Sequence, residues 1–182
     1  MESFIVPLLL IKFIMNNKED IKETADNRVF IVEDNEMDSL MMDYLLSQET
    51  IAHISKFSSG EECLKHMEMQ PDVVILDYGL PGINGVQTLL EIKKLNPDLP
   101  VIVITGNKDR HIAQKFLDAG VYDYIEKEDD AFDQVSRVTD SILNIIARKK
   151  DKEGHKANVT FALLISLFVV VACIATYFLL KH

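Results

Sequence analysis

The sequence predicts an α/β fold with a doubly wound, five-stranded parallel sheet, followed by one C-terminal transmembrane helix. Between Arg28 and Arg148, short apolar runs alternate five times with amphipathic stretches. Five βα units in a row indicate a parallel sheet that helices cover on both faces. Three of the runs are almost purely aliphatic, as expected of strands that are buried on both sides. The segment from Val159 to Leu180 contains no charged residue, which indicates a helix in a membrane.

Each predicted element follows from hydrophobic periodicity. The runs predicted as strands are Val29–Val32, Ile51–Phe57, Val73–Leu76, Val101–Ile104 and Val121–Ile125. The stretches predicted as helices are Met37–Ser47, Gly60–Met69, Val86–Leu95, Arg110–Ala119 and Phe132–Arg148. In the first of these helices, we expect one apolar face, made of Leu40, Met41, Tyr44 and Leu45.

The chain has 182 residues, which is room for one ordinary domain and a short extra segment. We predict an N-terminal extension over residues 1–27, a folded domain over 28–148, a basic linker over 149–158 and the transmembrane helix over 159–180. The linker segment is polar, and it either forms a true linker or continues the preceding helix. Three interpretations of the apolar segment Ser3–Met15 stay open: a membrane-surface segment, a cleaved leader, or residues upstream of the true start. Ordinary soluble sequence follows Met15, so either Met1 or Met15 is expected to be the start.

Charge and cysteine content narrow the class of protein. The formal net charge of −10 argues against a nucleic-acid partner, since a phosphate backbone requires a basic face. Two cysteines, Cys63 and Cys173, lie far apart, so neither a disulfide framework nor a zinc site is predicted. A reducing cytosol is the simplest compartment for the folded domain.

The C-terminal segment predicts a single-pass tail anchor. As a helix, residues 159–180 would extend roughly 33 Å, enough to cross a hydrocarbon core of about 30 Å. Basic residues cluster before the segment, so the positive-inside tendency places the folded domain in the cytoplasm and gives the chain membrane lipid as a partner. Small residues four apart would allow a homodimer through this helix; they are Ala162, Ser166, Ala172 and Thr176.

Polar side chains follow four of the predicted strands where each strand ends. Ligands of open α/β sheets bind beyond the carboxyl ends of the strands, so these side chains are expected to meet at one edge. They are Glu33 and Asp34 after the first strand, Asp77 after the third, Thr105 after the fourth and Lys127 after the fifth.

This combination of side chains suits phosphoryl transfer. Three neighbouring carboxylates resist ionising together, and a divalent cation removes that conflict. Hard oxygen ligands with few carboxylates suit Mg²⁺. A carboxylate can then act as the nucleophile and become an acyl phosphate, while Lys127 and Thr105 contact the phosphoryl oxygens.

Four motifs carrying these residues stand in a fixed order. They read RVFIVEDN over Arg28–Asn35, VVILDYGLPGING over Val73–Gly85, VIVITG over Val101–Gly106 and YDYIEK over Tyr122–Lys127. The acidic pair, the aspartate followed by Leu-Pro and a glycine, the threonine and the lysine resemble the receiver domains of two-component response regulators. The resemblance covers Arg28 to Arg148. It implies a flavodoxin-like sheet with strand order 2-1-3-4-5.

The resemblance also implies a role for each motif residue. Asp77 would be the phosphoryl acceptor. Asp34 and Asp77 would bind Mg²⁺ together with the backbone carbonyl of Gly79, with Glu33 supporting the ion through water. Lys127 would bind the phosphoryl group. Thr105 would turn toward it, and Tyr124 would be the aromatic residue that moves with Thr105.

The motifs depart from the family pattern after the lysine. Glu128 stands where family members often have proline, and with Asp129 and Asp130 it adds negative charge beside Lys127. This charge is expected to weaken the attraction between Lys127 and phosphate. Gly79 and Asn107 occupy variable positions at which the family tunes loss of the phosphoryl group.

The implied function is a membrane-tethered receiver that takes a phosphoryl group from a histidine kinase or phosphotransfer protein and changes its binding surface. We expect no enzyme activity beyond self-directed phosphoryl transfer and hydrolysis. We also expect no DNA-binding output, since little sequence separates Arg148 from the apolar segment. Two alternatives stay open: a docking module that takes no phosphate, and an unrelated flavodoxin-like or phosphatase fold. The second would be expected to carry a glycine-rich turn or an Asp-x-Asp motif after the first strand, and neither is present.

Overall fold

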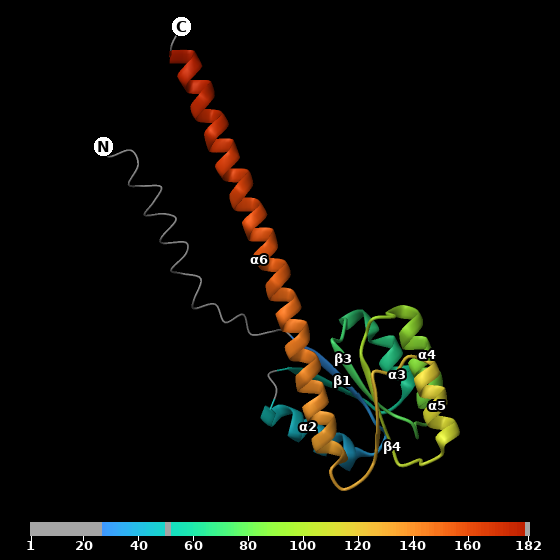
Figure 1. Cartoon of the computed structure of the whole chain (residues 1–182). Helices are drawn as coiled ribbons and strands as arrows, with labels where there is room; N and C mark the ends of the chain where they lie inside the picture. The colour runs from blue at the N-terminus through green and yellow to red at the C-terminus, as the bar shows by residue number, and fades with distance from the viewer. Residues whose placement is uncertain (1–26, 50–51, 181–182) are drawn as a thin grey trace.

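The computed structural model describes residues 27–49 and 52–180 (Figure 1). The predicted N-terminal extension, apart from Asn27, and the choice between Met1 and Met15 lie outside the described residues. In the last helix, the side chains of residues 153–158, 162 and 166–180 also lie outside them.

Five parallel strands form the sheet in the order β2-β1-β3-β4-β5, which confirms the predicted order. Their bounds are β1 Arg28–Val32, β2 His53–Phe57, β3 Val73–Asp77, β4 Val101–Thr105 and β5 Asp123–Glu126. Strand β5 begins two residues later than predicted. The amide of Val121 donates to the carbonyl of Phe116 at 3.1 Å and thereby ends the preceding helix, so it is not free to join the sheet.

Helices cover both faces of the sheet (Figure 1). Their bounds are α2 Glu36–Glu49, α3 Gly60–Lys65, α4 Gly85–Leu95, α5 Arg110–Asp118 and α6 Ala131–Leu180. Side chains cap several helix starts; Asn35, for example, accepts from the amide of Met37 at 2.9 Å. The predicted helix Gly60–Met69 is interrupted at His66 and continues as the 3₁₀ turn η2, Met67–Met69.

Two apolar cores lie on opposite faces of the sheet. On one face, α2 and α6 pack against alternate strand residues that include Ile31, Ile75 and Ile104. On the other face, the core includes Leu76 and Val103 from the strands and Leu89 and Phe116 from the covering helices α4 and α5. Strands β3 and β4 are buried along their whole length, as their aliphatic sequences predict.

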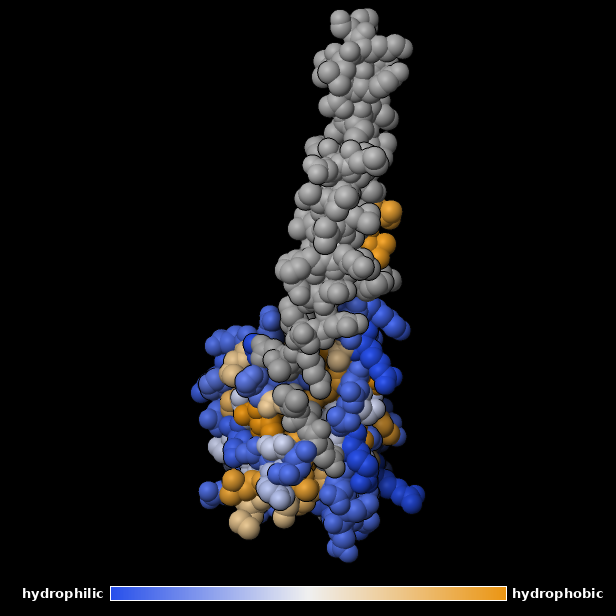
Figure 2. Space-filling view, turned by 90° about the vertical axis from the view of Figure 1, so that its left-hand side faces the viewer, coloured by the Kyte–Doolittle hydropathy of each residue, from blue (hydrophilic) through white to orange (hydrophobic). Residues whose placement is uncertain are grey.

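The prediction of which face of α2 is buried is wrong. Leu40, Met41 and Tyr44 are exposed, whereas Met42 and Leu46 are fully buried in the core beneath α6. The helix carries apolar residues on both sides, and contact with α6 decides which side is buried. Apolar side chains therefore stand out on the otherwise largely hydrophilic surface of the domain (Figure 2).

Helix α6 continues without interruption through the segment predicted as a linker and through residues 159–180 (Figure 1). Its 50 residues correspond to a length of about 75 Å. Lys150 pairs with Asp72 at 3.3 Å, close to the start of β3. For most residues of the predicted transmembrane helix, the side chains lie outside the described part of the structure. In the part that is described, no helix combines the length and the apolar character needed to cross a membrane.

Candidate functional site

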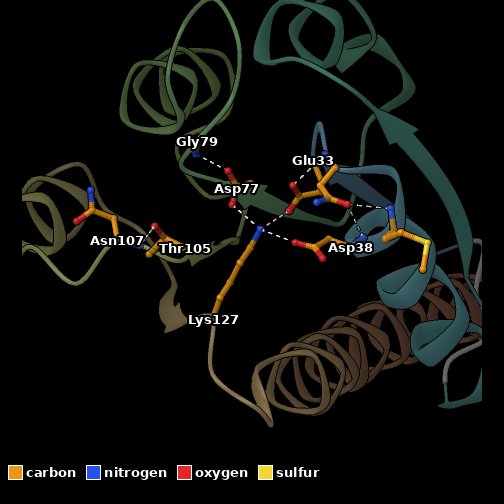
Figure 3. Close-up of polar contacts among 9 residues, drawn as sticks. Glu33, Asp38, Asp77, Gly79, Thr105, Asn107 and Lys127 are labelled. Atoms are coloured by element: carbon orange, nitrogen blue, oxygen red, sulfur yellow. Dashed lines mark hydrogen bonds and ion pairs between the residues drawn. The ribbon is translucent and has the colours of Figure 1, made fainter.

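The carboxyl ends of the strands bring the predicted polar residues together at one edge of the sheet (Figure 3). The Nζ atom of Lys127, after β5, lies 2.8 Å from Glu33 Oε2, after β1. The same Nζ atom lies 2.9 Å from Asp77 Oδ1, at the end of β3. Side chains separated by up to 94 positions in the sequence are therefore in direct contact.

Lys127 is the cation at the centre of this cluster (Figure 3). Besides Glu33 and Asp77, its Nζ atom contacts Asp38 Oδ2 at 2.9 Å. Partial burial acts to lower the pKa of Lys127, but hydrogen bonds to Glu33, Asp38 and Asp77 outweigh it and raise the pKa above its ordinary value. The ammonium therefore stays protonated at neutral pH and offers its three N–H groups to three carboxylates.

Glu33 depends most on this cation because its side chain is almost completely buried. Burial raises the pKa of Glu33, the hydrogen bond from Lys127 opposes that rise, and the charge of Asp77 adds to it. The other carboxylate oxygen of Glu33 accepts from the amide of Asn35 at 3.2 Å. Both oxygens of Glu33 thus have donors, which lowers the cost of keeping a charge in this position.

A divalent cation fits the acidic side of the cluster. One carboxylate oxygen from each of Glu33, Asp34 and Asp77 lies within 4.8 Å of the others. Each of the three acids thus offers one oxygen to a common ion, and Mg–O distances of about 2.1 Å would draw these oxygens closer together. Among the described residues this group consists of carboxylates alone, which matches the preference of Mg²⁺ for hard oxygen ligands.

The loop after Asp77 depends on two glycines. The amide of Gly79 donates to Asp77 Oδ2, and a Cβ atom at position 79 would lie 3.0 Å from that oxygen. A Cβ atom on Gly85 would lie 2.6 Å from the backbone oxygen of Asp77. Glycine at these positions lets the loop and the start of α4 close tightly around the carboxylate. The contact observed for Gly79 is through its amide, and the predicted role of its carbonyl stays a prediction.

Thr105 and Tyr124 are linked through the backbone of Asn107. The buried hydroxyl of Thr105 accepts from the amide of Asn107 at 3.0 Å. The hydroxyl of Tyr124 donates to the carbonyl of Asn107 at 3.0 Å. Tyr124 also packs against Phe116 of α5. A movement of Thr105 toward Asp77 would therefore disturb the segment that Tyr124 holds.

Residues 29–139, more than half of the chain, match the response regulator receiver domain family. The chain belongs to this family. The receiver domain is 32% identical over 123 residues to a protein-glutamate methylesterase/protein-glutamine glutaminase of Clostridium acetobutylicum, a match that covers 65% of this chain and 35% of that protein. Its matches to the first curated relatives span about a third to a half of their lengths.

Solved structures resemble the receiver domain in fold. The BeF3-activated receiver domain of DrrB matches with a TM-score of 0.60 and 25% identity, covering 65% of this chain and 98% of that one. The Mn²⁺-bound form of the response regulator Rcp1 matches with a TM-score of 0.56 and 26% identity, covering 62% of this chain and 91% of that one.

Glu128, the acidic residue after Lys127, forms an ion pair with another lysine. Glu128 pairs with Lys108 at 2.9 Å, which links the loop before α5 to the loop before α6 of the receiver domain. The carboxylates that contact Lys127 come from the loop after β1, from α2 and from β3. Lys108 thus provides Glu128 with a counter-charge, and the expected weakening of Lys127 by the negative charge of residues 128–130 stays a prediction.

Sequence reasoning missed Asp38, although it contacts the central lysine of the receiver domain. An acid in the first turn of a helix ordinarily stabilises the helix dipole, and this gave no reason to single it out. Its position four residues after Asp34 was a usable signal. A helix that starts at the rim places its first turn above the same edge of the sheet.

We predict that Lys127→Met destabilises the metal-free receiver domain by about 3 kcal/mol, because it leaves the buried carboxylate of Glu33 without a counter-charge. Mg²⁺ should restore part of this loss by supplying positive charge. Urea unfolding with and without Mg²⁺ measures both effects. Lys108→Met is the matched control, because its ion pair is exposed and its loss should change stability little. Equal destabilisation by the two substitutions would contradict the central position of Lys127.

Proposed function

We propose that this receiver accepts a phosphoryl group on Asp77 from a histidine kinase or a phosphotransfer protein. The observation that carries the proposal is the contact between Asp77 and Lys127 at the edge where Glu33 and Asp34 also lie. Membership in the receiver family and the match to the BeF3-activated domain of DrrB support it. We propose that the output is a changed binding surface.

The transfer needs one bond to form and one to break. A carboxylate oxygen of Asp77 attacks the phosphorus of the donor, and the bond from phosphorus to the donor nitrogen breaks with its electron pair moving to that nitrogen. Lys127 donates to a phosphoryl oxygen and offsets the added negative charge. The amide of Gly79, which already donates to Asp77, fixes the orientation of the carboxylate for the attack.

Glu33, Asp34 and Asp77 would hold Mg²⁺ in this receiver, together with the carbonyl of Gly79. The bound ion would supply charge neutralisation for the phosphoryl oxygens. The spacing of the carboxylate oxygens and the Mn²⁺-bound form of the relative Rcp1 support this assignment. Lys127 pairs with two of these carboxylates, those of Glu33 and Asp77, and its positive charge keeps them close together.

We also assign Thr105 and Tyr124 to the conformational response. When Thr105 turns its hydroxyl toward the phosphoryl group, it gives up the hydrogen bond from the amide of Asn107. The carbonyl of the same residue holds Tyr124, so the loop between β4 and α5 and the start of β5 change together. Phosphorylation at the rim thereby reaches the surface formed by α5, β5 and α6.

The test of the acceptor is substitution of Asp77. Asp77→Asn is expected to abolish incorporation of radiolabelled phosphate from acetyl phosphate in the presence of Mg²⁺, because the amide is not a nucleophile. Asp43→Asn is the control, since Asp43 is an acid of α2 that pairs with Lys56. It should keep full labelling. Persistent label in Asp77→Asn would show that another residue is the acceptor.

An exposed apolar surface lies on α2 beside the site. One side of α2 carries four exposed apolar residues: Met37, Leu40, Met41 and Tyr44. The first turn of the same helix carries Asp38, which contacts Lys127. An exposed apolar stripe of this kind suits protein docking. We infer that a phosphohistidine donor contacts this side of α2 during transfer.

Leu40→Asp should therefore slow transfer from a phosphohistidine protein at least tenfold, while the rate of labelling by acetyl phosphate stays unchanged. A small donor does not contact α2, so comparing the two donors separates docking from chemistry. Leu90→Asp, an exposed leucine of α4 on the opposite face of the sheet, is the control. If Leu40→Asp and wild type receive phosphate from the protein donor at equal rates, the docking surface lies elsewhere.

We further propose that residues 159–180 tether the receiver to a membrane, with the domain on the cytoplasmic side. The uncharged sequence and the exposed apolar side chains of Val159, Phe161, Leu163 and Leu164 on α6 support this proposal. The basic residues before the segment support the orientation.

The full chain is expected to remain in the membrane fraction of cells after washing with alkaline carbonate. A variant that ends at Lys152 should move to the supernatant, because it lacks the whole apolar segment. Recovery of the full chain in the supernatant would exclude the tether without affecting the assignment of Asp77.

A further inference from the structure

We propose that Asp38 is a positioning residue for phosphoryl transfer, whose carboxylate restrains the ammonium of Lys127 and weakens its attraction for the incoming phosphoryl group. This inference rests on the proposed function of Asp77 as acceptor. It concerns a residue outside the acidic pair that was predicted to bind the metal. It predicts that the charge of Asp38 slows phosphorylation of the receiver.

The contact between Asp38 and Lys127 is as short as the contacts that Lys127 makes with the site. Asp38 Oδ2 lies 2.9 Å from the Nζ atom of Lys127. Asn35 holds the first turn of α2 in place, because its side chain accepts from the amide of Asp38 at 3.2 Å. The position of Asp38 is therefore fixed by the start of the helix as well as by the lysine (Figure 3).

The hydrogen-bonding capacity of Lys127 is fully used. An ammonium has three N–H groups, and three carboxylates accept from it here: Glu33, Asp38 and Asp77. When a phosphoryl group joins Asp77, its oxygens need a donor from Lys127. The bond now made to Asp77 can pass to a phosphoryl oxygen, but the other two N–H groups stay directed at Glu33 and Asp38. The phosphoryl group thus shares the lysine with two competing anions.

Glu33 and Asp38 differ in how strongly they depend on the positive charge of Lys127. The side chain of Glu33 is 1% exposed, so loss of Lys127 would leave it with an uncompensated charge. The side chain of Asp38 is 29% exposed, and water can solvate it in place of the lysine. Asp38 is therefore the carboxylate whose charge can be removed without leaving a buried ion unpaired.

Asp38 also sets the net charge that the phosphoryl group meets. In the described structure the ammonium of Lys127 contacts the carboxylates of Glu33, Asp38 and Asp77, and a fourth carboxylate, that of Asp34, lies beside Glu33 and Asp77. A bound divalent cation leaves this cluster with one net negative charge, and neutralising Asp38 would bring it to zero. A dianionic donor approaches a neutral cluster more favourably than a negative one.

A purely structural role for Asp38 makes a different prediction. As an acid in the first turn of α2, Asp38 stabilises the helix through its interaction with the helix dipole, and Glu36 in the same turn does the same. Glu36→Gln removes the same charge from the same turn, and no contact joins Glu36 to Lys127 in the described structure. It is the matched control for Asp38→Asn, which keeps the size of the side chain and one hydrogen-bond acceptor.

The experiment measures the rate at which acetyl phosphate and Mg²⁺ label each full-length variant. Asp38→Asn should be labelled about threefold to tenfold faster than wild type, the range expected for losing a partly exposed charge contact. It should bind beryllofluoride more tightly by a similar factor, whereas Glu36→Gln should match wild type in both assays. An unchanged or slower rate in Asp38→Asn overturns the inference, as does equal acceleration by Glu36→Gln.

A second measurement follows Lys127 directly and does not depend on phosphorylation. In ¹⁵N-lysine NMR spectra, exchange of the Lys127 ammonium protons with water should be severalfold faster in Asp38→Asn and in Asp38→Ala than in Glu36→Gln. If wild type takes no label, the proposed function fails, and the exchange rates still decide whether Asp38 holds Lys127. Equal exchange rates in all variants would overturn the inference on their own.

Discussion

A single ammonium, that of Lys127, holds together carboxylates from three different elements, and the rest of the site depends on it. Asp38, Asp77 and the buried Glu33 would repel one another without a cation between them. The lysine lies in the loop between β5 and α6, so it also links the last strand to β1, β3 and α2. The same charge that stabilises the resting domain is the one that a phosphoryl group needs.

The sheet makes this arrangement possible by its order. Strand β3 lies between β1 and β4, so the acidic residues after β1 and the hydroxyl at the end of β4 flank Asp77 on either side. The register sets Asp77 beside Ile104, next to Thr105. Because β3 and β4 are buried along their length, small shifts at the rim must pass into the loops that follow the strands. The link from Thr105 through Asn107 to Tyr124 is one such route.

The sequence was sufficient for the features that depend on local pattern. Short apolar runs marked the strands, and the polar residues that follow these runs marked the rim, so the meeting of Glu33, Asp34, Asp77 and Lys127 could be predicted. Features that depend on packing could not be predicted in the same way. Helix α2 has apolar residues on two sides, and only contact with α6 selects Met42 and Leu46 for the core. In the sequence, Asp38 resembles an ordinary first-turn acid, because its contact with Lys127 depends on where the fold places the loop after β5.

The most direct test of this account is a double-mutant cycle between Glu33 and Lys127 in the metal-free protein. Urea unfolding of wild type, Glu33→Gln, Lys127→Met and the double variant gives the coupling energy of the pair. If the ammonium compensates the buried carboxylate, the coupling should be about 2 kcal/mol, with the double variant more stable than Lys127→Met alone. Effects that add to within about 0.5 kcal/mol would contradict the claim that Lys127 holds the site together.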